Sequence, residues 1–387
     1  MPATPRRTAH KARAAEVAPE EARKLHRALL GWYERERRDL PWRHTRDPYA
    51  IWVSEIMLQQ TRVETVIPYY DRFLRALPTV RALALAGEDH VMSLWSGLGY
   101  YRRARMLHEA AREVTARGGA LPLTRDGLLE VRGIGRYTAG AIASIAYGEA
   151  AALVDGNVAR VLARLFAVKE DVRGGAGLDR IWSLAEALVP DKAPGEWNQA
   201  LMELGATLCV PRAPRCLLCP ARKICVAHAR GLEATLPRLA SKAAPLAARQ
   251  VALVATVTTR GGARVLLARR RPGGLFGGMW EPPVVVEANG ADPDARAGLQ
   301  ALLGVALPDL IERGGVTHVL THRRLSTRVV SCELRRAPRV KLAPLGPYDA
   351  IAVVAPSDFA SLGISTLARK VLSRAGEPLT ASSSSAP

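Results

Sequence analysis

Apolar residues recur with a helical period over most of the first 230 residues. Residues 20–37 place Leu25 and Leu29 on one side of a helix and charged residues on the other, as expected of an amphipathic helix packed on a core. The same period predicts further helices over residues 50–66, 69–77, 80–86, 102–117, 138–147, 158–167, 179–188 and 197–208. No stretch before residue 230 alternates with the period of a strand, so this part is predicted to be all-α.

The pattern changes after residue 249. Residues 251–257 and 264–268 are β-rich runs separated by Arg260-Gly261-Gly262, which is a hairpin signal, and residues 328–334 form a third candidate strand. The stretch between the two parts, residues 233–249, has no steady period and is interpreted as a linker. The second part is therefore predicted to be an α+β domain.

These changes predict five segments, some structured and some not. They are a disordered basic tail over residues 1–20, an all-α domain over 21–230, a linker over 231–248, an α+β domain over 249–371 and a disordered tail over 372–387.

Charge narrows the choice of partner. The formal net charge is +19, and such a surface suits a polyanion, either nucleic acid or an anionic membrane. No apolar run approaches the roughly twenty residues of a membrane span, and no apolar signal-peptide core follows the basic N-terminal segment. We therefore expect a cytoplasmic, nucleoid-associated protein that binds nucleic acid and no membrane.

A glycine-rich turn, Val131-Arg132-Gly133-Ile134-Gly135-Arg136, precedes the predicted helix over residues 138–147. Gly133 and Gly135 allow a tight turn and leave the backbone N–H groups uncovered. Such N–H groups, where a turn meets a helix N-terminus, form an anion site. In a basic chain we expect that anion to be a DNA phosphate.

Two carboxylates stand in contexts that suggest chemistry. Asp155 lies in Val154-Asp155-Gly156-Asn157-Val158, where it is either the N-cap of the next helix or a functional carboxylate. Glu55 lies in a largely apolar helical run, where it is either a surface residue paired with a base such as Arg62 or a buried general acid with a raised pKa. As a pair they would resemble glycosidase carboxylates, one acting as acid and one stabilising an oxocarbenium-like cation.

Four of the five cysteines follow a close spacing, Cys209-x6-Cys216-x2-Cys219-x5-Cys225, and Cys332 stands alone. Secreted disulfide frameworks spread their cysteines along the chain, so a structural metal centre is the better interpretation. Sulfur ligation fits either zinc or an iron–sulfur cluster, and the spacing does not decide between them. The basic residues in this segment suggest that it also faces phosphate; they are Arg212, Arg215, Arg222 and Lys223.

Several motifs together resemble the helix-hairpin-helix DNA glycosylase superfamily, and within it the MutY family of adenine DNA glycosylases. They are LPWR, DPYAIWVSEIMLQQTRV, GLGYYRRAR, VRGIGRYTAGAI followed by VDGNVARVL, and WNQALMELGATLC with the cysteine spacing. The similarity is dense from about residue 25 to residue 225 and continues more weakly into a region similar to a Nudix (MutT-like) fold. The expected fold class is multidomain, with an all-α helix-hairpin-helix glycosylase domain that carries an iron–sulfur cluster loop, plus an α+β Nudix-like domain.

The resemblance implies a [4Fe–4S] cluster at the four cysteines. It implies a monomer whose partner is double-stranded DNA with an adenine:8-oxoguanine or adenine:guanine mispair, from which the adenine is flipped out. By similarity, Glu55 protonates the adenine at N7, and Asp155 stabilises the deoxyribosyl cation, directly or as a transient adduct. Asn157 orients Asp155 or a phosphate, and water completes the hydrolysis.

The resemblance also implies contacts with DNA. Arg43 is expected to help hold the adenine. Gln59 or Gln60, and Tyr100, resemble residues that wedge into the base stack beside the lesion, where stacking offsets part of the cost of unstacking.

Tyr137 distinguishes this chain from bifunctional relatives, which carry Lys directly after the hairpin as a Schiff-base nucleophile. The next lysine in the sequence, Lys169, does not match that position. We therefore expect base excision without efficient strand cleavage. A packing or phosphate-bonding role for Tyr137 at this catalytic position is compatible with that expectation.

The second domain departs from the Nudix hydrolases. Their signature holds Mg²⁺ with several Glu on one helix, and the corresponding region, GADPDARAGLQALLG, contains none, so nucleotide hydrolysis is not expected. The loop that reads 8-oxoguanine usually contains Phe-Ser-His, where this chain has Leu320-Thr321-His322. Thr321 keeps a hydroxyl, Leu320 offers no aromatic surface, and His322 taken alone is more often an ordinary loop histidine.

The sequence leaves three other functions open. An endonuclease III-like glycosylase/lyase acting on oxidised pyrimidines is disfavoured by Tyr137 and by the second domain. A non-catalytic DNA-binding protein is disfavoured by the presence of both Glu55 and Asp155. A stand-alone nucleotide hydrolase is disfavoured by the missing Glu residues.

Overall fold

The structure is a computed structural model that describes residues 17–240, 244–287, 295–337 and 346–377. The chain divides into two units, Met1–Gln59 with Glu113–Ser241, and Gln60–Arg112 with Lys242–Pro387. Most of the two predicted tails, residues 1–16 and 378–387, lies outside the described residues. No helix in the described part of the chain is long and apolar enough to cross a membrane.

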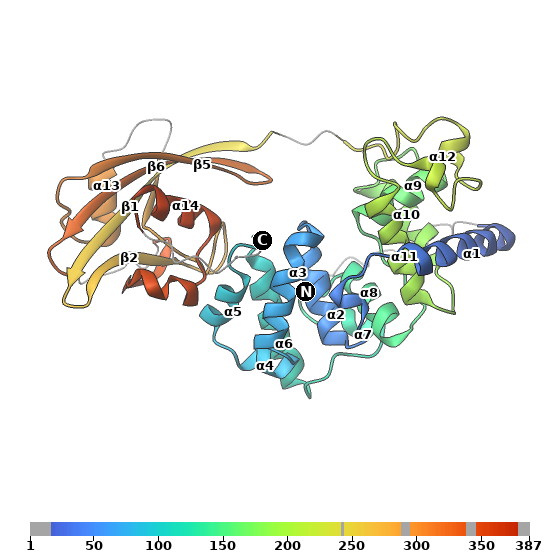
Figure 1. Ribbon diagram of the computed structural model, residues 1–387, viewed down its shortest axis with the longest axis horizontal. Coiled ribbons are helices and arrows are strands. Elements are labelled where there is room, and N and C mark those ends of the chain that lie inside the picture. Colours follow the sequence, from blue (N-terminus) through green and yellow to red (C-terminus); the bar gives the residue numbers. More distant parts are fainter. Residues whose placement is uncertain (1–16, 241–243, 288–294, 338–345, 378–387) are drawn as a thin grey trace, which may run out of the picture. The chain divides into compact units, whose positions relative to one another are not determined.

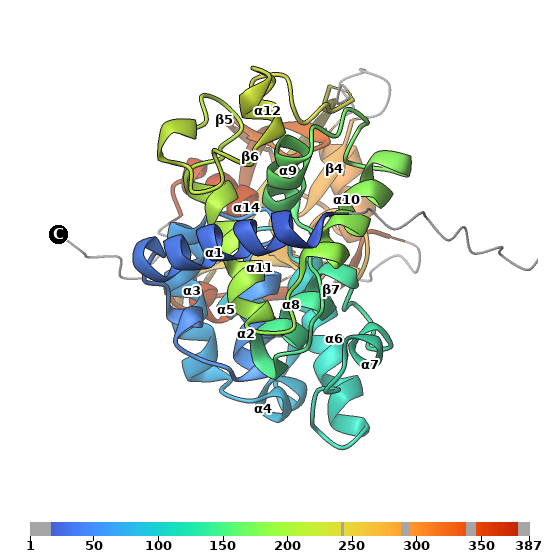
Figure 2. The ribbon, with the colours of Figure 1, turned by 90° about the vertical axis from the view of Figure 1, so that its right-hand side faces the viewer.

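The first unit is built from helices, as the sequence pattern predicts. Its elements are α1 (Pro19–Glu36), η1 (Pro41–Arg43), α2 (Pro48–Leu58), α7 (Arg125–Leu129), α8 (Arg136–Tyr147), α9 (Gly156–Leu165), α10 (Gly175–Leu188), α11 (Pro194–Thr207), η2 (Cys216–Leu218) and α12 (Val226–Ala229). Figures 1 and 2 show α1 beside α11, with α9 and α10 next to them. The apolar faces of these helices meet in a core that includes Leu29, Leu162 and Trp197.

The second unit begins with short helices, which are α3 (Val63–Ala76), α4 (Val80–Leu85), α5 (Glu88–Trp95) and the larger part of α6 (Arg102–Ala116). The prediction of one helix over residues 50–66 is wrong, because α2 ends at Leu58 and α3 begins at Val63. Gln60 between them has φ +59°, and this left-handed backbone cannot continue a right-handed helix. The predicted start of the next helix at residue 69 is also wrong, since α3 begins at Val63 and continues through Pro68.

The remainder of the second unit is a mixed sheet with helices. Its strands are β1 (Leu246–Thr259), β2 (Gly262–Arg270), β3 (Trp280–Glu281), β4 (Val284–Val286), β5 (Ile311–Val319), β6 (Arg323–Leu334) and β7 (Tyr348–Val354). The sheet order is β3-β2-β1-β6-β5, with β4 paired to β1 and β7 to β2. The β1–β6 pair is parallel and the other ladders are antiparallel.

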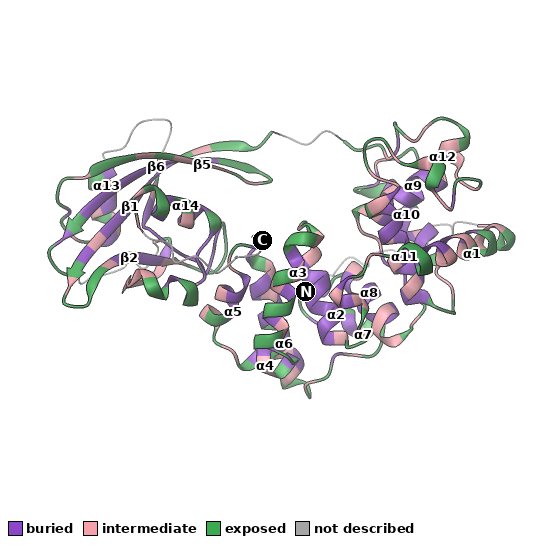
Figure 3. Cartoon of the chain, viewed as in Figure 1, coloured by how far each residue is buried: buried purple, intermediate pink, exposed green. Residues whose placement is uncertain are grey.

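Helix α13 (Ala295–Leu303) places Leu299 and Leu303 in the apolar core on the buried strands, which Figure 3 shows in purple. Helix α14 (Thr366–Arg374) contacts β5, β1 and β6, and a short helix, η3 (Pro356–Ser361), lies between β7 and α14. Strand β1 begins at Leu246, so the end of the predicted linker is a strand.

Candidate active site

The glycine-rich turn directly precedes α8, as predicted, and joins it to α7. Gly133 has φ +85°, which the turn requires, and Gly135 is the N-cap of α8. Among the described residues, the N–H groups of Gly133 and Gly135 have no acceptor, so both remain available to an anion. A Cβ at Gly140 would lie 2.1 Å from the carbonyl oxygen of Ala152, so α8 packs directly on the segment that leads to Asp155.

Asp155 is the N-cap of α9. Its Oδ1 accepts a hydrogen bond from the Val158 N–H at 2.7 Å, and its Oδ2 accepts one from Asn157 Nδ2 at 2.9 Å. Burial raises the pKa of this carboxyl, and the hydrogen bonds from Val158 and Asn157 oppose the rise. The capping role and a functional role are compatible, because capping fixes the direction of the carboxylate and leaves each oxygen a further lone pair.

Glu55 lies on α2, whose residues from Tyr49 to Met57 are all buried. Its side chain is 4 % exposed, which excludes the alternative of a surface residue paired with Arg62. Tyr137 on α8 donates a hydrogen bond from its phenol to Glu55 Oε2. Burial raises the pKa of Glu55 to about 7; the Tyr137 hydrogen bond lowers it, the Asp155 charge raises it and the Arg43 charge lowers it. Glu55 is therefore a carboxyl that can carry a proton at neutral pH.

Arg43 is held by a residue that the sequence analysis missed. Glu203 on α11 is 1 % exposed and accepts hydrogen bonds from Arg43 at 2.6 Å and from Arg38 at 2.8 and 2.9 Å. Burial opposes its ionisation, but the two arginines lower the pKa of Glu203 to about 2. The sequence contains a signal for a buried carboxylate here, because Glu203 is an acidic residue in the apolar run WNQALMELGA. Glu55 stands in a similar apolar run.

A chain of hydrogen bonds connects Asp155 to the cysteine segment. Asn157 Oδ1 accepts a hydrogen bond from Arg160 Nη2 at 2.7 Å, and Arg160 Nε donates to the carbonyl oxygen of Cys209 at 2.8 Å. A Cβ at Gly205 would lie 2.6 Å from the Asn157 Cβ, so a glycine at this position allows α11 to pack closely against Asn157.

The four clustered cysteines line one pocket together with Arg164, His228 and Glu233. Four thiolates on one zinc ion lie roughly 3.8 Å apart, given Zn–S bonds of about 2.3 Å. Among the described residues, no three of the cysteine sulfurs lie within 4.8 Å of one another. The described residues therefore contain no preformed tetrahedral zinc site at the four cysteines.

The surroundings of the pocket suit thiolates that are bound to metal. Burial raises the pKa of Cys219 to about 12, so binding as a thiolate requires metal cations. Arg164, which is 2 % exposed, donates a hydrogen bond to Cys209 Sγ at 3.3 Å. The four basic residues of the segment, Arg212, Arg215, Arg222 and Lys223, are exposed, as a surface that faces phosphate requires.

The remaining predicted DNA contacts lie on loops. Gln59 follows α2, and Gln60 is exposed. Tyr100 is 44 % exposed with φ +48°, and its hydroxyl lies 2.8 Å from the Thr321 hydroxyl. Thr321 and His322 are exposed in the turn between β5 and β6. The structure thus brings together Tyr100 and Thr321, two of the residues predicted to meet the lesion. The positive φ of Tyr100 is a strained backbone conformation, and such strain is concentrated at functional sites.

Helix α13, at the place of the Nudix catalytic helix, reads ARAGLQALL and contains no carboxylate. A magnesium-dependent hydrolase site therefore has no ligands on this helix.

Both parts of the chain are similar to known proteins. The family model described as "HhH-GPD superfamily base excision DNA repair protein" matches residues 53–176, and the NUDIX domain model matches residues 254–374. The adenine DNA glycosylase of Homo sapiens is 37 % identical, over 89 % of this chain and 72 % of the human protein. The adenine DNA glycosylase of Rattus norvegicus is 39 % identical, over 80 % of this chain and 70 % of the rat protein. A solved structure of a thermostable thymine-DNA glycosylase is 33 % identical with a TM-score of 0.49, covering 55 % of this chain and 98 % of that one.

Proposed function

This chain belongs to the adenine DNA glycosylase family of base excision repair, and we propose that its substrate is adenine paired with 8-oxoguanine or with guanine. The main observation in support is that the buried Glu55 accepts a hydrogen bond from Tyr137 and interacts electrostatically with Asp155. These groups suit hydrolysis of the N-glycosidic bond of an adenine flipped out of the duplex.

Glu55 supplies the acid. With a pKa of about 7 it carries a proton for part of the time at neutral pH, and donation to adenine N7 turns the base into a neutral leaving group. Arg43, fixed by Glu203, is suited to hold the adenine because its guanidinium cannot move freely. A rigid donor loses little conformational entropy when it binds a base.

Asp155 supplies the stabilising charge. Breaking the glycosidic bond develops positive charge on the deoxyribose, and a carboxylate beside it lowers the barrier. Asn157 and the Val158 N–H hold the Asp155 oxygens in place. A water molecule then completes the hydrolysis.

Tyr137 favours a monofunctional enzyme. Its phenol donates a hydrogen bond to Glu55, and burial raises its pKa well above the ordinary value. Tyr137 therefore has no amine to form a Schiff base, and its phenol stays protonated, so it cannot act as the nucleophile of a lyase. Lys169 is exposed and follows α9. We therefore propose base release without efficient strand cleavage, in contrast to an endonuclease III-like lyase.

Lesion reading is assigned to the Tyr100–Thr321 pair, with His322 beside it. A ring on a strained, exposed loop suits insertion into a base stack. The adjacent Thr321 hydroxyl and the His322 ring are the groups suited to contact the opposite base.

The cofactor is assigned as a [4Fe–4S] cluster held by Cys209, Cys216, Cys219 and Cys225. The shared pocket that all four cysteines line supports this choice, because four thiolates are the usual ligands of such a cluster. When bound, the cluster supplies metal–thiolate bonds that order the cysteine segment. Arg160 connects that segment to Asn157 and so to Asp155.

The test uses a duplex with one adenine:8-oxoguanine pair, with an adenine:guanine duplex and a fully paired duplex beside it. Wild type and Asp155→Asn are compared, and products are separated with and without alkali. Strand breaks that need alkali and disappear in Asp155→Asn support the proposal. Breaks without alkali identify a lyase, and tight binding without base release in wild type supports a non-catalytic DNA-binding protein.

A further inference from the structure

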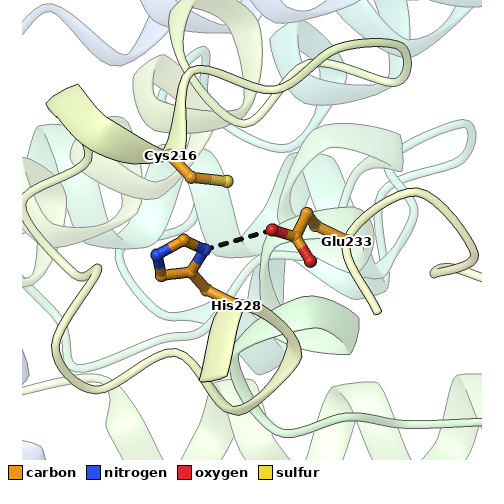
Figure 4. Close-up of side chains that lie close together, drawn as sticks. All are labelled: Cys216, His228 and Glu233. Carbon is orange, nitrogen blue, oxygen red and sulfur yellow. Dashed lines mark hydrogen bonds and ion pairs between the residues drawn. The ribbon is translucent and has the colours of Figure 1, made fainter. Parts of the chain in front are cut away.

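Two side chains to which no role has been assigned, His228 and Glu233, line the cysteine pocket together with the proposed cluster ligand Cys216. Figure 4 shows the side chains of Cys216, His228 and Glu233 pointing toward one another. His228 Nδ1 lies 3.1 Å from Glu233 Oε1, and one donor atom from each of the three residues lies within 4.8 Å of the other two. These are a sulfur, a nitrogen and an oxygen donor, all of which bind iron or zinc in proteins.

The geometry leaves room for a metal atom. An atom at the centre of three donors this close lies within about 2.8 Å of each, and small movements reach the usual bond lengths of about 2.0–2.3 Å. Glu233 Oε2 is buried and has no hydrogen-bond partner among the described residues. A buried carboxylate oxygen without a partner is costly, and a nearby cation removes that cost.

The other three cysteines lack such neighbours. Among the described residues, only Cys216 belongs to a group of this kind. Cys209 instead receives a hydrogen bond from Arg164, and Cys225 donates one to the Arg164 carbonyl oxygen. A guanidinium has no lone pair to give to a metal, and a backbone carbonyl oxygen is a hard donor, so neither replaces a thiolate ligand.

From this asymmetry we propose that His228, oriented by Glu233, is a reserve ligand for the iron atom that Cys216 binds. The inference rests on the proposed iron–sulfur cluster. When the Cys216 bond to iron breaks, a ring nitrogen of His228 donates the lone pair that completes the iron coordination, and the released thiolate takes a proton from water. Histidine serves as a cluster ligand elsewhere, where it replaces cysteine on one iron. The cluster would thus survive chemical loss of its Cys216 ligand.

The test compares single ligand losses in the full chain purified without oxygen. Cys216→Ser removes the ligand for which His228 is the proposed replacement. Cys225→Ser is the matched control, because it removes a ligand for which no replacement is proposed. Iron and sulfide are counted per chain, and the reduced cluster is examined by electron paramagnetic resonance. We expect Cys216→Ser to keep most of its iron with an altered signal. Cys225→Ser and the double variant Cys216→Ser/His228→Ala should each keep about tenfold less.

Each outcome is decisive. Equal iron loss in Cys216→Ser and Cys225→Ser overturns the proposal, as does equal retention in Cys216→Ser and the double variant. Should Cys216→Ser fail to fold by circular dichroism, His228→Ala with all four cysteines present is exposed to air and an iron chelator. Faster iron release than in wild type supports the reserve ligand, and an unchanged rate overturns it. Wild type without iron and sulfide would contradict the cofactor assignment itself, which is a separate result.

Discussion

Tyr137, the second residue of the helix that follows the glycine-rich turn, donates its hydroxyl hydrogen bond to Glu55 on α2. The turn that is suited to bind a DNA phosphate and the proposed acid are thus joined through one helix. This hydrogen bond stabilises the ionised form of Glu55, while burial favours the protonated form. The proton affinity of Glu55 is therefore a balance that a single substitution can shift.

The first prediction concerns pH. The reactive state needs Glu55 protonated and Asp155 ionised. Single-turnover base release should therefore rise at low pH as Asp155, whose pKa burial raises, loses its proton, and should show a falling limb of tenfold per unit above a pKa of about 7 as Glu55 ionises. Tyr137→Phe removes an interaction that lowers this pKa, so the falling limb should move to higher pH by about one unit.

The control for this shift is Tyr147→Phe on the same helix, because Tyr147 bonds to the Leu121 carbonyl oxygen and not to Glu55. Its pH profile should match wild type. A Tyr137→Phe profile that is unchanged, or that moves to lower pH, would contradict the role assigned to this hydrogen bond.

The second prediction concerns Glu203. Glu203→Gln leaves Arg43 and Arg38 without their buried counter-charge, and breaking a buried ion pair costs about 3–5 kcal/mol. Glu196→Gln on the same helix is the control, since its pair with Arg46 is largely exposed and should cost at most about 1 kcal/mol. Urea unfolding of both variants measures the difference, and equal losses would show that the Glu203 pair contributes no more than a surface pair.

How much of this site is visible in the sequence depends on distance along the chain. Asp155 and Asn157 are predictable together because capping is a local interaction over three residues. The four cysteines are predictable because their spacing is short. Glu203 was missed because its contact with Arg43 spans 160 residues, and no local pattern predicts which buried charges will meet.

The fold shows the same limit. Helices with a clear apolar stripe, such as α1 and α9, are predictable from their period. The break after α2 depends on the positive φ of Gln60, for which a glutamine gives no signal. Strand β5, with a Gly-Gly pair and mostly exposed side chains, has no continuous apolar run, and only its ladder with β6 identifies it as a strand.

The third prediction tests the approach of α11 to the Asp155 site. Gly205→Ala places a methyl group 2.6 Å from the Asn157 Cβ, so Asn157 must move and its bond to Asp155 weakens. We expect a stability loss of about 1–3 kcal/mol and a clear fall in the rate of base release, with DNA binding retained. Gly156→Ala is the control, because its Cβ meets nothing within 4 Å. A wild-type rate in Gly205→Ala would show that the position of Asn157 does not limit the reaction.

The last prediction concerns lesion preference. Thr321→Val keeps the shape of the side chain but removes the hydroxyl that lies 2.8 Å from the Tyr100 hydroxyl. Under the proposed function, the Thr321 hydroxyl forms a hydrogen bond of about 1.4 kcal/mol with 8-oxoguanine but not with guanine. Its loss should therefore lower the preference for adenine:8-oxoguanine over adenine:guanine about tenfold. Thr321→Ser restores the hydroxyl and should restore the preference. Single-turnover rates on the two duplexes give the ratio, and an equal fall on both would mean that Thr321 positions the loop without reading the base.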